Sequence, residues 1–208
     1  MRVLITGFGP FPGAPFNPSA ALVKALARRR RPALAGIVRT AHIFATTYDA
    51  VDRDLPKLFA QKPDIILMFG LAGSRRRVCI ETRARNAVSL LYPDASGQRP
   101  QRGIIVAGGR ALRGNAPFVA LLAALQNAAI PTRLSSDAGR YLCNYSYWRA
   151  LERAGHGHQL VQFVHIPRVR FDPRRRRKTR SVAFRPLVTA TEKLLVALIA
   201  AKRQRLLR

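Results

Sequence analysis

Cys143 is the strongest candidate nucleophile in the chain. It lies in segment 135–145, which reads Ser-Ser-Asp-Ala-Gly-Arg-Tyr-Leu-Cys-Asn-Tyr and is predicted to run from a strand into a helix. A thiol in the first turns of a helix faces unpaired backbone N–H groups and the positive end of the helix dipole, which favour the thiolate. Thiolates are nucleophiles in acyl transfer. The competing interpretation is a cysteine buried as a small apolar residue.

His165 is a candidate base for that nucleophile. It ends the apolar run of segment 160–166, at the carboxyl end of a predicted strand, where α/β sheets place their sites. A neutral imidazole there could deprotonate Cys143 and later protonate a leaving amine. The alternative is a core histidine that donates to a backbone carbonyl. His42 lies on another predicted strand, and the Gly-His-Gly-His turn at 155–158 makes a weak metal site because no carboxylate or thiol accompanies it.

Glu81 is the third candidate, inside the predicted strand 78–85. A carboxylate buried within a strand is costly unless it is paired. Its partner could be His165, whose tautomer and developing charge a carboxylate would stabilise. The alternative is an ion pair with Arg83 or Arg85, which share a face with Glu81 if the strand is regular.

Length, composition and charge restrict the number of domains, the class of protein and its location. The chain has 208 residues, 48% of them hydrophobic, and a formal net charge of +27. This length and apolar content predict one domain, residues 1–208, with a large core. With only two cysteines, the chain is not a disulfide-rich scaffold. The apolar run 194–201 is too short to span a membrane. We therefore expect a cytoplasmic protein. Its charge would attract polyanions non-specifically, most visibly through the basic run 174–178.

The elements that must position these residues alternate along the chain. A continuous apolar run over 64–70 predicts a strand covered on both faces. Strands interleaved with helices predict an α/β sheet with helices on each side. Further strands are predicted at 3–6, 36–44, 78–85, 132–135 and 160–166, and helices at 20–27 (with Ser19 as cap), 48–60, 117–128, 138–154 and 182–205 (interrupted early by Pro186), with a long loop at 92–103.

The turn that follows the first strand reads Gly-Phe-Gly-Pro-Phe-Pro-Gly over residues 7–13. It is a poor phosphate loop, because its spacing is wrong and its prolines remove N–H donors. Phe8 and Phe11 on this rigid turn instead suit the walls of a small apolar pocket.

Taken together, these residues resemble the pyroglutamyl peptidase I family of cysteine peptidases, also called pyrrolidone carboxyl peptidases. The resemblance spans nearly the whole chain, and its most specific part is the segment around Cys143. The segments that carry it are 3–8 with Pro10-Phe11, 17–19, 62–64, 70–73, Asn86-Ala87, Pro93-Asp94, 135–145 and 163–167.

The resemblance implies a three-layer α/β/α sandwich with a mostly parallel sheet, no metal or cofactor, a cytosolic location and often a homotetramer. It implies removal of amino-terminal pyroglutamyl residues from peptides through an acyl-enzyme. The family's nucleophile would fall on Cys143, its general base on His165 and its orienting carboxylate on Glu81. Its pocket for the lactam ring would fall on Phe8 and Phe11, and further on Tyr92 and Leu142.

The sequence also departs from the family pattern. Thr82 stands where Lys or Arg usually follows the glutamate, and Leu91 and Tyr92 replace the usual Arg and Ile. Two other functions stay open beside the peptidase. One is a catalytically weakened, basic protein that binds anions or nucleic acid, and the other is hydrolysis of a different small amide.

Overall fold

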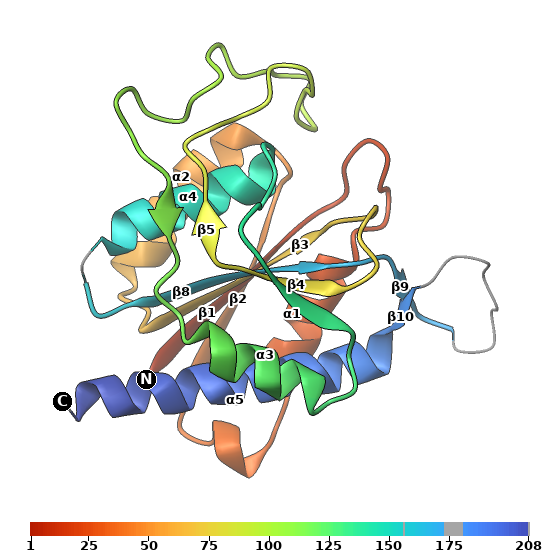
Figure 1. The fold of residues 1–208 in the computed structure, drawn as a ribbon, viewed down its shortest axis with the longest axis vertical. Coiled ribbons are helices and arrows are strands. Elements are labelled where there is room, and N and C mark those ends of the chain that lie inside the picture. Colours follow the sequence, from red (N-terminus) through yellow and green to blue (C-terminus); the bar gives the residue numbers. More distant parts are fainter. Residues whose placement is uncertain (156, 173–180, 208) are drawn as a thin grey trace.

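The computed structural model describes residues 1–155, 157–172 and 181–207. Six strands form the central sheet in the order β2-β1-β3-β8-β4-β7 (Figure 1). Their bounds are β1 Arg2–Phe8, β2 Val38–Phe44, β3 Ile65–Leu71, β4 Val78–Glu81, β7 Thr132–Ser135 and β8 Leu160–Ile166. β2, β1, β3 and β8 are mutually parallel, whereas β4 runs antiparallel to β8 and parallel to β7. The predicted mostly parallel sheet is confirmed.

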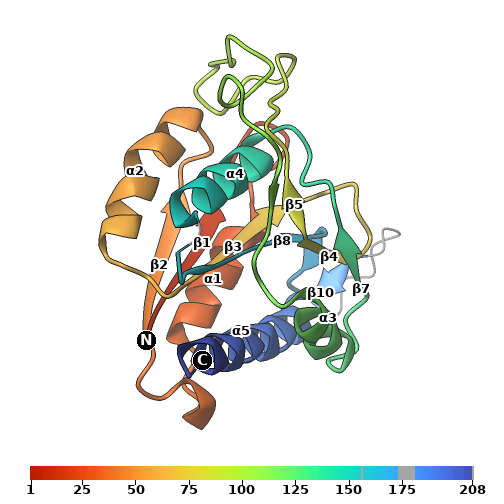
Figure 2. The same cartoon turned by 60° about the vertical axis from the view of Figure 1, so that its left-hand side comes forward.

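Helices cover both faces of this sheet, as Figure 2 shows. Helices α1, α3 and α5 pack on one face, and α2 and α4 pack on the other. Their bounds are α1 Pro18–Arg28, α2 Tyr48–Ala60, α3 Phe118–Gln126, α4 Leu142–Ala154 and α5 Phe184–Leu206, with a short 3-10 helix at Pro32–Leu34. The layers are those of the predicted α/β/α arrangement.

β3 shows why the sequence forms such layers. Ile65, Leu67 and Phe69 pack into the cluster beneath α1 and α5, whereas Ile66 and Met68 pack into the cluster beneath α2 and α4. All five side chains are completely buried. Successive side chains of a strand point to opposite faces, so a strand covered on both sides needs an unbroken apolar run.

The predicted strand 78–85 is wrong in its second half. β4 ends at Glu81, and after Thr82 the short strand β5 (Arg83–Ala84) pairs with β6 (Leu112–Arg113), away from the central sheet. The carbonyl of Glu81 accepts hydrogen bonds from the Tyr147 hydroxyl at 2.9 Å and from Nε2 of Gln162 at 3.0 Å. The Thr82 N–H still donates to the Ser135 carbonyl at 2.7 Å, but the chain then turns from the central sheet to β6, and the regular alternation that would align Glu81 with Arg83 and Arg85 is broken.

Helix boundaries differ from the predictions near caps and prolines. α1 is capped by Asn17, whose Oδ1 accepts from the Ser19 N–H at 3.1 Å, so Ser19 is not the cap. α4 begins four residues later than predicted, because the Asp137 side chain accepts from the Gly139 N–H at 2.9 Å and Gly139 has a φ of +83°. This turn holds the preceding loop outside the helix. α5 is not interrupted by Pro186, which lies in its first turn, where its missing N–H is not needed.

The remaining predicted elements are present with small shifts at their ends. A further short pair joins β9 (Val169–Arg170) to β10 (Val182–Ala183). The basic run 174–178 lies outside the described residues. Within the described ranges, no helix combines the length and the apolar character needed to cross a membrane.

Asn144 ties α4 to the segment that follows β5. Its Oδ1 accepts from the Arg85 N–H at 2.8 Å, and its Nδ2 donates to the carbonyls of Arg85 and Ala87, both at 2.9 Å. The Asn144 side chain is completely buried. One amide side chain therefore satisfies three backbone groups next to Cys143.

Asn144→Ala should lower the free energy of unfolding by about 2–4 kcal/mol, because it leaves three partly buried backbone groups without their partner. Urea titration measures this loss. Glu152→Ala on the same helix is the control: it removes one exposed ion pair with Arg149 and should cost less than about 1 kcal/mol. Equal losses in the two variants would show that the Asn144 contacts do not hold this segment.

Candidate active site

Cys143 is the second residue of α4, and its side chain lies against the sheet at Gly70. A Cβ atom placed on Gly70 would lie 2.6 Å from the Cys143 sulfur and 2.8 Å from the Phe163 ring. Only glycine leaves room for the sulfur here. Cys143 is partly exposed, whereas the second cysteine, Cys79, is completely buried.

The strand register places His165 on the same face as Cys143. Gly70 on β3 is the register partner of His165 on β8. Paired residues point to the same side of a sheet, and His165 alternates with Val164, which packs on the opposite face. The ring of Phe163 packs 4.9 Å from the imidazole, centroid to centroid. The imidazole therefore faces α4, on the side where Cys143 contacts the sheet.

Glu81 completes the group from β4. It is completely buried, and His165 is 4% exposed. Nδ1 of His165 lies 2.8 Å from Oε1 of Glu81. When Nδ1 donates its proton to this carboxylate, Nε2 keeps a lone pair that can accept a proton. The start of α4 and the ends of β8 and β4 thus bring a thiol, an imidazole and a carboxylate to one face of the sheet.

The arginine that contacts Glu81 is Arg75. Its Nη1 donates to the same Oε1 atom at 2.5 Å. Arg83 and Arg85, which the sequence suggested as competitors, lie beyond the break at Thr82, and the guanidinium of Arg85 lies 3.4 Å from Asp137 instead. Sequence reasoning missed Arg75. The available signal was the basic run 75–77 in the turn that leads into β4.

Burial sets the electrostatics of the site. It raises the pKa of the Cys143 thiol to about 12; the negative charge of Glu81 adds to this rise and the positive charge of Arg75 opposes it. Burial also lowers the pKa of the His165 imidazole, against the hydrogen bond and the charge of Glu81. Burial thus opposes the thiolate that the helix start favours, because desolvation and the helix dipole act on the Cys143 pKa in opposite directions. An imidazole on the same sheet face as the thiol suits proton transfer during attack.

The first turn of α4 also presents backbone donors beside the thiol. The first four N–H groups of a helix lack intrahelical acceptors, and they include those of Leu142, Cys143 and Asn144. Among the described residues, the side chain of the N-cap residue Tyr141 makes no capping hydrogen bond. Such donors can stabilise negative charge that develops on a carbonyl oxygen bound next to Cys143.

The predicted pocket residues lie in unequal environments. Phe8 and Leu142 are buried in the cluster beneath α2 and α4, and the Phe8 ring lies 5.8 Å from that of Phe44. Phe11 is half-buried. Tyr92 is 63% exposed. The structure thus buries two of the four predicted residues together and leaves Tyr92 on the surface.

Loops nevertheless converge around these residues. The Gly9 carbonyl accepts from Nδ2 of Asn17 and from the Thr46 hydroxyl, each at 3.0 Å. The Tyr141 hydroxyl donates to the Pro93 carbonyl at 3.0 Å. The Ala95 N–H donates to the Thr46 carbonyl at 2.9 Å. The ends of β1 and β2, the loop around Tyr92 and the start of α4 are therefore joined.

Another described histidine, His42, lies elsewhere on the sheet. His42 lies on β2, where its Nε2 is 3.3 Å from Asp54 and its ring packs 4.6 Å from that of Phe44. His156 lies outside the described residues. Across the part of the chain that the structure describes, no group of three or more His, Cys, Asp or Glu side chains could hold a metal ion.

Comparisons with known proteins identify the family of the chain. The model of the pyroglutamyl peptidase family matches residues 1–204. The pyrrolidone-carboxylate peptidase of Thermococcus onnurineus is 33% identical over 171 residues, which cover 80% of this chain and 84% of the relative. That of Vibrio vulnificus is 34% identical over 167 residues, covering 80% and 78%. The crystal structure of pyroglutamyl peptidase I from Bacillus amyloliquefaciens superposes with a TM-score of 0.84 at 26% identity, covering 97% of this chain and 98% of the other. The chain belongs to the pyroglutamyl peptidase family.

Proposed function

We propose that this protein is a cysteine peptidase that removes amino-terminal pyroglutamyl residues from peptides. The observation that carries the proposal is the buried 2.8 Å contact between Glu81 and His165, on the sheet face where Cys143 contacts Gly70. Family membership supplies the substrate class, since the curated relatives are pyrrolidone-carboxylate peptidases. In this proposal Cys143 is the nucleophile, His165 the general base and Glu81 the carboxylate that orients it.

The proposed reaction follows from the arrangement of the thiol, the imidazole and the carboxylate. Nε2 of His165 takes the thiol proton as the Cys143 sulfur attacks the pyroglutamyl carbonyl carbon. The first-turn N–H groups of α4 stabilise the oxyanion. His165 then gives the proton to the departing amine, which leaves a thioester on Cys143. Water, deprotonated by His165, attacks the thioester and releases pyroglutamate, and the proton returns to the thiolate.

Substrate recognition belongs to the same proposal. Phe8, Phe11, Leu142 and Tyr92 would form the walls around the lactam ring, with the joined loops behind them. The whole chain, residues 1–208, would act as one domain, assemble as a homotetramer and work in the cytoplasm without a metal or cofactor. These features follow from the family resemblance. Assaying pyroglutamyl amides beside other small N-terminal amides tests the alternative that a different amide is the substrate.

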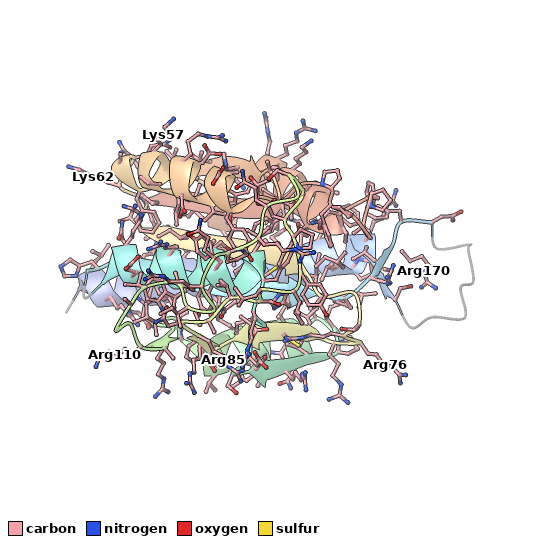
Figure 3. The ribbon with its side chains drawn as sticks, turned by 90° about the horizontal axis from the view of Figure 1, so that it is seen from above. Lys57, Lys62, Arg76, Arg85, Arg110 and Arg170 are labelled. Carbon is pink, nitrogen blue, oxygen red and sulfur yellow. The ribbon has the colours of Figure 1, made fainter. Side chains whose placement is uncertain are left out.

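Polyanion binding is the second candidate function, and the arrangement of the cations favours a non-specific form of it. The formal net charge is +27. Figure 3 shows Lys57 and Lys62 on one side of the molecule, Arg76 and Arg110 on the opposite side, and Arg170 at an end. The first four of these residues are exposed, and Arg170 is partly exposed. Cations spread over several sides attract a polyanion without fixing one orientation, and so without reading a sequence.

Iodoacetamide should label Cys143 much faster than Cys79 near neutral pH, because Cys143 is partly exposed beside His165 whereas Cys79 is completely buried. Mass spectrometry of tryptic peptides measures both rates. Cys143→Ser should lose nearly all turnover of a fluorogenic pyroglutamyl amide, since a hydroxyl is a far weaker nucleophile. Cys79→Ser is the matched control and should keep most of the activity. Equal labelling, or selective labelling of Cys79, would count against the assignment.

Glu81→Gln should lower turnover by about a hundredfold or more, because an amide neither fixes the required imidazole tautomer nor stabilises its positive charge. Steady-state kinetics with the same amide measure the loss, and circular dichroism checks the fold. Full activity in this variant would make Glu81 a structural ion-pair partner rather than a catalytic group.

Affinity for double-stranded DNA should be the same for unrelated sequences and fall by roughly a thousandfold between about 50 and 200 mM salt. Fluorescence anisotropy measures it. Charge reversal at Lys57 and Lys62 should weaken binding about as much as reversal at Arg76 and Arg110 on the opposite side. Sequence-selective binding that survives high salt would instead support the binding-protein function.

A further inference from the structure

Arg75 connects three separate parts of the site. It lies in the turn between β3 and β4, and its Nη1 donates to Oε1 of Glu81 at 2.5 Å and lies 3.4 Å from the Ser135 hydroxyl. Its Nη2 donates to the Asp137 carbonyl at 2.5 Å. Ser135 ends β7, and Asp137 opens the loop that enters α4 six residues before Cys143. One guanidinium therefore joins the carboxylate of the site to the loop that carries the nucleophile.

The carboxylate has few other partners. Oε1 of Glu81 contacts both Nη1 of Arg75 and Nδ1 of His165. Oε2 is buried and has no hydrogen-bond partner among the described residues. A buried carboxylate stays ionised only when a nearby cation compensates for its lost hydration. The Arg75 side chain is itself only 20% exposed, so water screens its interaction with Glu81 weakly.

We propose that Arg75 is a positioning residue of this site: its guanidinium pairs with the buried Glu81 carboxylate and keeps it directed at His165, and it anchors the loop that presents Cys143. The inference rests on the proposed peptidase function of the same three residues. Nothing in the reaction requires Arg75 to touch the substrate. Its action passes through Glu81 and through the Asp137 carbonyl.

The charges around the imidazole set the direction of the pH effect. The groups that face His165 are Glu81 and Cys79 from β4, Cys143 from α4, and Arg75 and Asp137 from the two loops. The positive charge of Arg75 lowers the pKa of His165, in the same direction as burial. Glu81 and His165 act as one coupled pair, and a proton added to either adds positive charge beside Arg75. Removal of Arg75 therefore makes the pair bind its proton at a higher pH.

The fork of the guanidinium explains why arginine suits this position. Arginine presents several N–H donors in a rigid plane, and here they reach acceptors on β4, on β7 and on the following loop. A lysine ammonium would keep the charge but could not span the same acceptors. Arg75→Lys thus separates the electrostatic part of the role from the anchoring part.

The test compares Arg75→Ala and Arg75→Lys with Arg76→Ala and Arg77→Ala, which remove exposed arginines of the same turn. For Arg75→Ala we expect kcat/KM for a pyroglutamyl amide to fall by about a hundredfold. We expect the acid limb of its pH profile to move upward by about one pH unit or more. Arg75→Lys should keep the acid limb near its wild-type position while kcat stays low. Millimolar guanidinium should restore part of the activity of Arg75→Ala and none of that of Arg75→Lys.

Alkylation of Cys143 by iodoacetamide across the same pH range provides a readout that needs no turnover. The proposal predicts the same upward shift in that profile for Arg75→Ala. Should Arg75→Ala fail to fold by circular dichroism, Arg75→Lys decides: a kcat equal to that of Arg77→Ala would overturn the proposal. So would an unshifted acid limb in a folded Arg75→Ala. An inactive wild-type protein whose alkylation profile still shifts on loss of Arg75 would refute the peptidase function and leave the positioning role in place.

Discussion

A buried carboxylate shared between a cation and an imidazole is the constraint around which this site is built. Glu81 is completely buried, and one of its oxygens receives both Arg75 and His165. Removing a charge from water costs several kcal/mol unless compensating partners surround it. The neighbouring elements must therefore hold their positions. The Glu81 carbonyl is held by Tyr147 and Gln162, and the turn that carries Arg75 is tied to the Asp137 carbonyl.

The change in strand direction makes this arrangement possible. β4 runs antiparallel to β8, so residues of the two strands meet as cross-strand neighbours rather than at one common edge. Cys79 is the register partner of His165, and Glu81 lies two residues along β4 on the same face, within diagonal reach of the imidazole. The parallel part of the sheet supplies Gly70, whose missing side chain admits the Cys143 sulfur.

Several of the protein's ten acidic residues are committed to local contacts. Oε1 of Glu81 lies 2.8 Å from Nδ1 of His165, and Asp94 accepts from the backbone N–H groups of Tyr48, Ser96 and Gln98. Glu192 pairs with two arginines of the segment after α1. With such acids committed to local structure, the exposed arginines and lysines dominate the surface field.

The sequence alone determined the fold class and the three residue types of the site. Continuous apolar runs, helix periodicity and turn residues are local signals, and they predicted a mostly parallel sheet with helices on both faces. The segments around Cys143 and His165, together with Glu81, carried the family resemblance. The ends of the helices and strands were less predictable from the sequence. The start of α4 depends on a turn between Asp137 and Gly139, and the end of β4 depends on side chains that are distant in the chain.

Only the tertiary structure decided which arginine meets Glu81 and in which direction burial shifts the pKa of the thiol. Period-two alternation favoured Arg83 and Arg85, but the chain leaves the sheet at Thr82 and the turn between β3 and β4 brings in Arg75 instead. The helix start favoured a thiolate, but packing against Gly70 and Phe163 desolvates the sulfur and raises the pKa of Cys143. Both outcomes depend on contacts between segments far apart in the chain, and burial and charge pairing act through those contacts rather than through local spacing.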